Sequence, residues 1–98
     1  MTDVSFEWDP NKAATNRLKH GVSFEEAATV FDDDVALLIA DPDHSRFEER
    51  FVLLGLSMAL RVLVVVHCHH EAAARIRLIS ARKATRTESV QYEAAMSR

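Results

Sequence analysis

RVLVVVHCHHEAAARIRLISAR, residues 61–82, is the stretch that decides the fold of this chain. Residues 62–66 are apolar at every position, which is typical of a strand covered on both faces in the middle of a sheet. Residues 75–82 begin with alternating polar and apolar side chains, which predicts a second strand with two different faces. Because the link at residues 70–74 is short, the two strands are expected to form an antiparallel hairpin.

The segments before this stretch extend the predicted sheet. Residues 35–40 and 47–56 have the composition of strands, with a loop at residues 41–45 between them. The short link at residues 57–60 predicts another hairpin, so the last strands form an antiparallel meander. A short alternating segment at residues 4–8 is predicted to be an edge strand.

Capping signals predict three helices. The first helix begins with Asp-Pro at residues 9–10 and ends at Gly21, which is expected to adopt a left-handed conformation. Capping boxes at residues 23–26 and 85–88 begin the second and third helices, and the third runs to about Met96. The order is β-α-α-β-β-β-β-α. It predicts an α+β domain with a mainly antiparallel twisted sheet and helices packed on one face.

The second helix has an apolar face and ends in an acidic run. Phe24, Ala27, Ala28 and Phe31 recur at helical spacing, so they are expected to pack in the core. The three aspartates at residues 32–34 are interpreted as a solvated turn, because a metal site would require more ligands at defined spacing.

Length and composition predict one cytosolic domain, residues 1–98. The hydrophobic content of 48% is that of a globular protein, and no apolar run is long enough to span a bilayer. The N-terminal segment lacks the basic and apolar regions of a secretory signal. The single cysteine, Cys68, cannot form an intramolecular disulfide, in agreement with a reducing compartment.

The charge of the chain is divided unevenly. Residues 1–50 carry 5 Lys/Arg and 12 Asp/Glu, a net of −7, whereas residues 51–98 carry 7 Lys/Arg and 3 Asp/Glu, a net of +4. The basic excess is concentrated in residues 75–86, which hold five cations and no acid. Such a field attracts phosphate even though the whole chain is acidic. The alternative is that these arginines pair with the acids of the first half.

Alternation along residues 75–82 predicts where the basic side chains point. Arg75 and Arg77 are expected to share one face with Ile79 and Ala81, while Arg82 is expected on the other face. Two neighbouring arginines on a sheet can hold a phosphate through forked hydrogen bonds. Cleavage of RNA also requires groups that carry protons and cations that stabilise the phosphorane. The candidate proton carriers are His20, Glu49, Tyr92 and the histidines of residues 67–70, and the candidate cations are Arg50, Arg61, Arg77, Arg82 and Lys83.

Residues 67–70, His-Cys-His-His, resemble a metal-binding cluster. On a strand, however, two of these side chains point to each face, and zinc requires three or four ligands. We therefore predict no metal site and no cofactor.

Four segments of the chain carry a resemblance to a known family. FEWDPNKAATNRLKHGVSFEEA, HSRFEERFVLLGLS, RVLVVV and RIRLISARKATRTE, followed by Tyr92, resemble the BrnT-type toxins over residues 5–93. The resemblance implies a RelE-like fold and a ribonuclease that inhibits translation and growth. It also implies a neutralising BrnA-like antitoxin that binds operator DNA. Leu60 departs from the pattern, because the family usually has glycine before Arg-Val-Leu-Val, so the turn is expected to differ.

The resemblance and the residue chemistry together define the predicted site. The catalytic candidates are His20, Glu49, Arg50, Arg77, Arg82 and Tyr92. The candidate RNA-binding residues are Lys12, Lys19, Arg61, Arg75, Lys83 and Arg86. The antitoxin is expected to dock on the basic face or on an edge strand such as residues 4–8. Two other functions stay open, a non-catalytic module that binds RNA or a partner and a small zinc protein.

Overall fold

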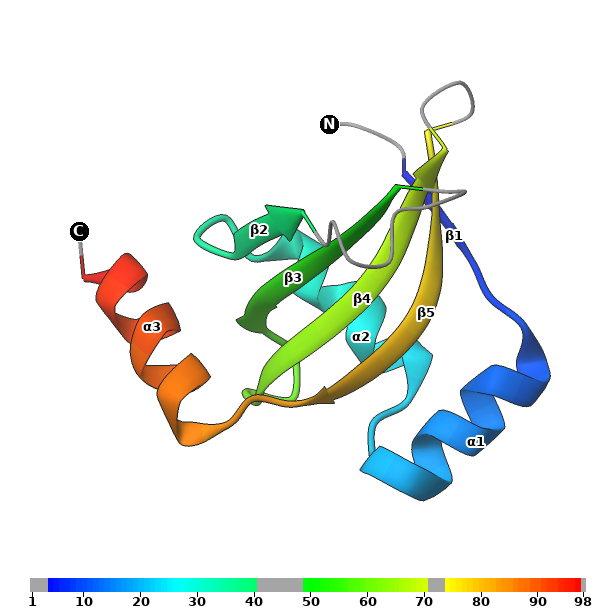
Figure 1. The fold of residues 1–98 in the computed structure, drawn as a ribbon, viewed down its shortest axis with the longest axis horizontal. Coiled ribbons are helices and arrows are strands. Elements are labelled where there is room, and N and C mark those ends of the chain that lie inside the picture. The colour runs from blue at the N-terminus through cyan, green and yellow to red at the C-terminus, as the bar shows by residue number, and fades with distance from the viewer. Residues whose placement is uncertain (1–3, 41–48, 71–73, 98) are drawn as a thin grey trace.

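A computed structural model describes residues 4–40, 49–70 and 74–97, which form a five-stranded sheet with three α-helices (Figure 1). The elements are β1 (Ser5–Glu7), α1 (Pro10–His20), α2 (Phe24–Thr29), a 3-10 turn η1 (Val30–Asp32), β2 (Leu37–Ala40), β3 (Arg50–Leu56), β4 (Val62–His70), β5 (Arg75–Lys83) and α3 (Arg86–Met96). The predicted α+β class and element order are confirmed. The predicted loop at residues 41–45 lies outside the described residues, as does the beginning of the strand predicted from residue 47.

The sheet is mixed, with the strand order β1-β5-β4-β3-β2. The β2–β3, β3–β4 and β4–β5 pairs are antiparallel, whereas β1 is parallel to β5 and pairs Ser5 with Arg75. The apolar strand β4 is central and the short β1 is an edge strand, as the sequence predicts. The parallel pair forms because α1 and α2 carry the chain from β1 to the opposite edge of the sheet before the meander returns.

Local capping bonds fix the helix ends. Asp9 accepts a hydrogen bond from the backbone of α1 at 2.8 Å, and Gly21 ends that helix with a φ of 69°. The Ser23 hydroxyl accepts the N–H of Glu26 at the start of α2, at 3.0 Å. Both bonds of the predicted capping box at Thr85 are present in α3. Because these signals depend only on neighbouring residues, the sequence predicts the helix starts well.

Two apolar clusters lie on opposite faces of the sheet. One joins α2 and η1 to the sheet through Phe24, Val30, Leu53 and Val65, among others. The other packs Tyr92 of α3 against Leu54 and Val64. Leu53 and Leu54 are consecutive in β3, so their side chains point in opposite directions.

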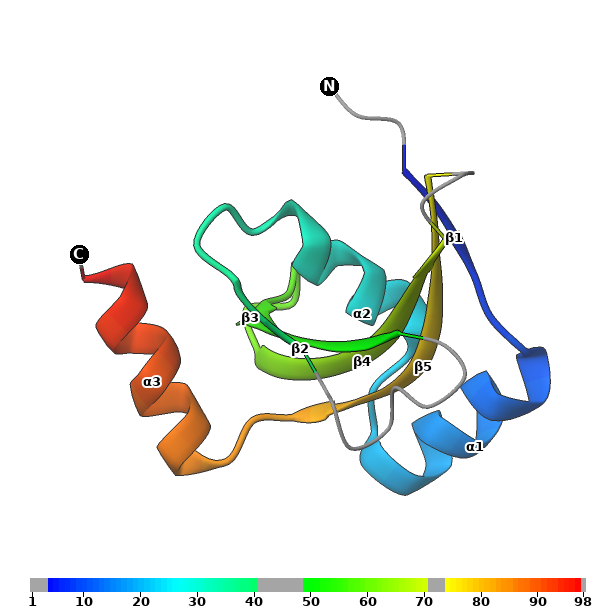
Figure 2. The same ribbon diagram turned by 45° about the horizontal axis from the view of Figure 1, so that its top comes forward.

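The prediction that all helices pack on one face is therefore wrong. Figure 2 shows α2 above the curved sheet and α1 and α3 at its two lower corners. Tyr92 provides the physical reason, because its buried ring requires an apolar surface and α2 already occupies the other face.

A β-bulge changes which side chains of β5 share a face. Ser80 is opposite Val66 and Leu78 is opposite His67, so Ile79 is an extra residue in the strand. Arg77 and Arg82 therefore point to the same face, where the sequence predicts opposite faces. We refer to this surface, which Ser80 shares, as the arginine face.

The turn between β3 and β4 keeps a left-handed residue without glycine. Leu60 has a φ of 61°, a conformation that costs an L-residue about 1 kcal/mol or more. The turn is closed by the hydrogen bonds from Ser57 N to Arg61 O and from Leu60 N to Ser57 O, both 2.9 Å long. Leu60 therefore occupies, under strain, a conformation that suits glycine.

Candidate nucleic-acid interface

Asn16 attaches α1 to the edge of β5. Within the part of the chain that the structure describes, β1 pairs with residues 75–77 of β5 and no strand lies beside the next part of that edge. The Asn16 Nδ2 group donates to the carbonyls of Ala81 and Val22, both at 2.9 Å, and Oδ1 accepts the Ala81 N–H at 3.0 Å. The amide thus makes the bonds that a neighbouring strand would make to Ala81. This buried contact fixes one face of α1 beside β5.

A groove of about 310 Å³ lies between α1 and β5. Lys12 and Lys19 are exposed on its wall, and His20 is half-buried. We call it the basic groove, and its lining residues are Asn11, Lys12, Thr15, Asn16, Lys19, His20, Ile79 and Ser80. Two ammonium groups, one imidazole and nearby hydroxyls form a surface that suits the phosphates of a nucleic acid.

The arginine face continues the positive surface across the sheet. In the strand register, Arg50 of β3 and Arg77 of β5 are both opposite Cys68 of β4. With a strand spacing of about 4.8 Å, the backbones of the two arginines lie about 10 Å apart. The structure thus brings Arg50 and Arg77 to one level of one face, while Arg61 lies at the other end of β4.

Arg61 is bound to a carboxylate. Its Nε donates to Glu26 Oε2 at 2.9 Å, and its Nη2 donates to Glu26 Oε1 and to the Gly21 carbonyl. The hydrogen bond from Arg61 is the main cause that lowers the pKa of Glu26. Since Ser57 also donates to Glu26, at 2.7 Å, this network attaches the β3–β4 hairpin to α2.

Arg82 is bound in the same manner at the start of α3. Its guanidinium donates to both oxygens of Glu88, at 2.8 and 2.9 Å. This pair is the main cause that lowers the pKa of Glu88 to about 2. Arg61 thus has a partner in the acidic first half of the chain, as the alternative interpretation expects, whereas the partner of Arg82 lies in the second half.

Tyr92 is buried, with 3% of its surface exposed. Its hydroxyl donates to Asp33 Oδ2 at 2.6 Å, and burial together with this bond raises the pKa of Tyr92 to about 12. The contact holds α3 against the sheet. A catalytic role for Tyr92 stays a prediction, and the buried ring lines no part of the basic groove.

Asp33 differs from the predicted solvated turn. Its carboxylate accepts N–H groups from Leu56 at 2.9 Å and Val35 at 3.1 Å in addition to the Tyr92 hydroxyl. Burial raises the pKa of Asp33, but these three hydrogen bonds outweigh that effect and lower it. Asp33 is therefore a structural connector, while its neighbours Asp32 and Asp34 are exposed.

Other predicted site residues lie away from the basic groove. Glu49 is exposed immediately before β3, and Lys83 is exposed at the end of β5. Arg75 is exposed, 3.9 Å from the carboxylate of Glu7, and Arg86 is exposed in the first turn of α3. Among the described residues no group of three or more His, Cys, Asp or Glu side chains is placed to hold a metal ion.

Thr15 and Ser80 also line the groove, although neither is predicted from the sequence as a site residue. Thr15 had a usable signal, because it shares the helical spacing of Lys12, Lys19 and His20. Ser80 had none, because its orientation depends on the bulge at Ile79.

Comparisons with known proteins give the family. A sequence model of the family described as "Ribonuclease toxin, BrnT, of type II toxin-antitoxin system" matches residues 8–88. A crystal structure of the Brucella abortus ribonuclease toxin BrnT is similar in fold, with a TM-score of 0.65 and 21% sequence identity. The similarity covers 86% of this chain and 100% of the Brucella chain. No individually curated protein matches the sequence.

The matched segment begins at Trp8 and ends at Glu88, so it contains α1, the meander and every residue that lines the basic groove. Within the described residues, no helix has the length and apolar character needed to cross a membrane. The family match covers most of the sequence, and the chain belongs to the BrnT family of ribonuclease toxins of type II toxin–antitoxin systems.

Proposed function

We propose that this chain is a metal-independent endoribonuclease with a RelE-like arrangement, which cleaves RNA in the cytoplasm and so inhibits translation and growth. The family match over residues 8–88 carries the proposal. The basic groove and the adjoining arginine face support it, because together they form a phosphate-binding surface on an acidic chain.

The groove supplies groups for cleavage by the ribose 2′-hydroxyl. In the proposed reaction His20 accepts the proton of that hydroxyl, and the ribose 2′-oxygen attacks the adjacent phosphorus. The bond from phosphorus to the 5′-oxygen breaks, and that oxygen leaves with a proton from the site or from water. The products are a 2′,3′-cyclic phosphate and a 5′-hydroxyl.

Cations are expected to bind the substrate and stabilise the negative phosphorane. Lys12 and Lys19 hold the RNA backbone along α1, while Arg50 and Arg77 stabilise the transition state from the sheet. Glu49 is retained as a second candidate proton carrier because it precedes Arg50. We assign the remaining cations to weaker RNA contacts at the rim: Arg75, Lys83 and Arg86.

A BrnA-like antitoxin is the proposed protein partner. Membership in a type II toxin family implies an antitoxin that silences the ribonuclease. We propose that this antitoxin has a DNA-binding segment and carries the toxin to the operator of their operon.

Cleavage in the absence of metal tests the proposed activity. Purified chain is incubated with RNA in EDTA across a range of pH, and the products are separated on a gel. His20→Gln and Arg77→Ala are each expected to slow cleavage roughly 100-fold or more. His69→Gln is the matched control, since His69 is exposed on the other face of the sheet, and its rate is expected to equal that of wild type.

Two outcomes would contradict the proposal. Intact RNA at every pH in EDTA would exclude a metal-independent nuclease. RNA retained on the gel without product would instead favour the non-catalytic binding module.

A further inference from the structure

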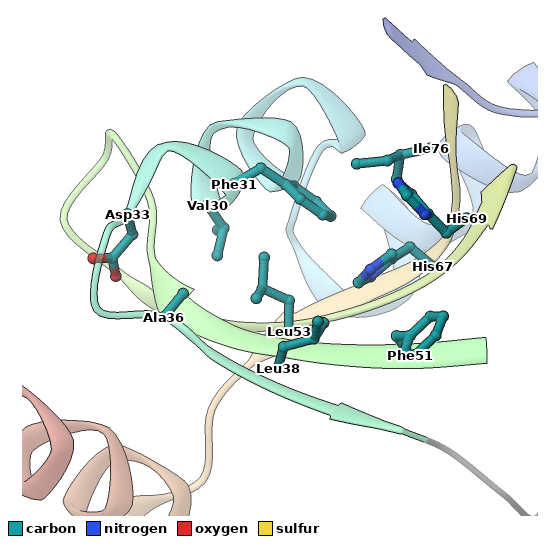
Figure 3. A pocket seen from close by; sticks show the side chains of 10 residues that line it. All are labelled: Val30, Phe31, Asp33, Ala36, Leu38, Phe51, Leu53, His67, His69 and Ile76. Carbon is teal, nitrogen blue, oxygen red and sulfur yellow. The ribbon is translucent and has the colours of Figure 1, made fainter. Parts of the chain in front are cut away.

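The face of the sheet opposite the arginine face contains an apolar cavity of about 280 Å³ (Figure 3). It opens between η1 and strands β2, β3 and β4. Its apolar and aromatic walls are formed by Phe31, Leu38, Phe51, Leu53, His67 and Ile76. Its volume is sufficient for one large side chain, and its walls offer few polar partners for a charged group.

Ring contacts hold the cavity open in a defined shape. The imidazole of His67 meets the ring of Phe31 edge-on at 4.8 Å between centroids and stacks on Phe51 at 6.0 Å. Burial is the main cause that lowers the pKa of His67, so the ring is neutral at physiological pH. The cavity is thus preformed and apolar, and an occupant would lose little free energy in reorganising its walls.

The mouth of the cavity lies at an edge strand. Among the strands that the structure describes, β2 is the last of the sheet, and its Leu38 points to the cavity with 61% of its surface exposed. The next residue, Ile39, is 52% exposed but is paired with Val52, so it points to the opposite face. Exposed apolar side chains on an edge strand are a recurring surface for binding an extended segment of another protein.

Negative charge beside the cavity indicates the chemistry of its occupant. Asp33 lines the cavity, and its neighbours in the sequence, Asp32 and Asp34, are exposed. RNA is a poor occupant because its phosphates would be repelled by these aspartates. A protein segment with lysine or arginine beside a large apolar residue complements both features.

We propose that this cavity and the β2 edge are a docking site for the antitoxin, which inserts one large apolar side chain and places basic residues opposite Asp32 and Asp34. The proposal rests on the toxin–antitoxin function proposed above. It differs from docking on β1 or over the basic residues, the two surfaces expected from the sequence. Because Ser80 of the basic groove lies on the other face of the sheet, this docking segment and the part of the antitoxin that blocks RNA are separate.

Two adjacent positions on β2 test the proposal. The antitoxin encoded beside this toxin is purified, and its affinity is measured for wild type, Leu38→Lys and Ile39→Lys. Leu38→Lys is expected to weaken binding at least tenfold, because it puts a charge into the apolar mouth. Ile39→Lys adds the same charge to the same strand, but on the opposite face, and is expected to change affinity less than threefold.

Milder variants distinguish a loss of docking from a loss of folding. Leu38→Ala removes the rim contact with less disturbance and is expected to weaken binding in the same direction. Asp32→Asn combined with Asp34→Asn is expected to slow association at low salt and to reduce its salt dependence. Thermal melting of each variant should stay close to that of wild type.

The opposite results would overturn the docking site. Equal affinity for wild type, Leu38→Lys and Leu38→Ala would exclude the cavity, and so would an equal loss for Leu38→Lys and Ile39→Lys. RNA cleavage by the two Leu38 variants without antitoxin is measured in parallel and is expected to match wild type. A wild-type chain that cannot cleave RNA would contradict the proposed function, whereas the contrast between positions 38 and 39 would still decide the docking site.

Discussion

The cations at the hairpin end of the sheet and those of the basic groove have the same charge but different surroundings. Arg61 and Arg82 each bind both oxygens of one carboxylate, and each bond attaches a helix to the sheet. Lys12 and Lys19 are exposed on the wall of a groove, and none of the described residues that line this groove carries a carboxylate. The cations of this chain therefore form two groups, and the positions of the acidic side chains separate them.

Among the variants that compare the two groups of cations, removal of the groove lysines is expected to have the largest effect, which is on RNA affinity. Lys12→Ala combined with Lys19→Ala should weaken RNA binding at least tenfold at low salt. The slope of log affinity against log salt should fall by about 1.4, since each lost phosphate contact on a single strand contributes about 0.7. Binding is measured by fluorescence anisotropy with His20→Gln in every protein, so that the RNA stays intact.

Arg17→Ala is the matched control for that experiment. Arg17 is an exposed cation on the same helix, but it lies beside Ser23 and Phe24, away from the basic groove. If Arg17→Ala weakened RNA binding as much as the double variant, the net charge of the protein would explain the binding. The groove would then have no special role in it.

Arg61→Ala is expected to have the opposite signature, a loss of stability with activity retained. The pair that Arg61 forms with Glu26 is partly buried, with side-chain exposures of 32% and 15%. Removing it should lower the free energy of unfolding by about 1–2 kcal/mol, because Glu26 loses its charged donors. Chemical denaturation measures the loss, and RNA cleavage by the folded variant should stay within threefold of wild type. Cleavage abolished at unchanged stability would return Arg61 to the site, where the sequence analysis predicts it.

A structural feature of this chain can be predicted from the sequence when its signal is local. The start of α1 at Asp9, its end at Gly21 and the capping box at Thr85 are confirmed, since each is decided within about four residues. The central position of β4 is also confirmed, because its apolar run requires cover on both faces.

Features that depend on distant pairing were not predicted. Neither the parallel pairing of β1 nor the bulge at Ile79 has a local signal, yet the bulge decides that Arg77 and Arg82 share a face. The role of Asp33 was missed for the same reason, because Tyr92 is distant in the sequence and reaches it only through the position of α3. The sequence therefore shows which cations are present, and the tertiary structure decides which of them bind carboxylates of the protein.

Acid should weaken the ion pair between Arg82 and Glu88 and so lower the stability of the fold. The folded pKa of Glu88 is about 2, below its ordinary value of 4.5, so its contribution is complete above pH 4.5 and is lost as pH falls toward 2. Glu88→Gln should remove about 1 kcal/mol at neutral pH, a modest amount because Arg82 is partly exposed. It should also flatten the dependence of unfolding free energy on pH between 4.5 and 2.

His67 supplies an internal control for that titration. Burial lowers the pKa of His67 from 6.5, so the unfolded chain takes up a proton first and stability falls as pH drops below 6.5. Glu88→Gln should leave this upper part of the curve unchanged. If the variant flattened both regions equally, the loss could not be assigned to the pair of Arg82 and Glu88.

The smallest expected effect is a gain of stability at the turn that precedes Arg61. Leu60 has a φ of 61° with 79% of its surface exposed, so glycine would relieve strain and lose little packing. Leu60→Gly should stabilise the fold by about 0.5 kcal/mol, because the greater freedom of glycine in the unfolded chain offsets part of the relief. Ala59→Gly, at a neighbouring position without a positive φ, should destabilise it, and thermal melting distinguishes the two. Equal changes in both variants would mean that the turn bonds of Ser57, and not the strain at Leu60, set the stability of the hairpin that positions Arg61 against Glu26.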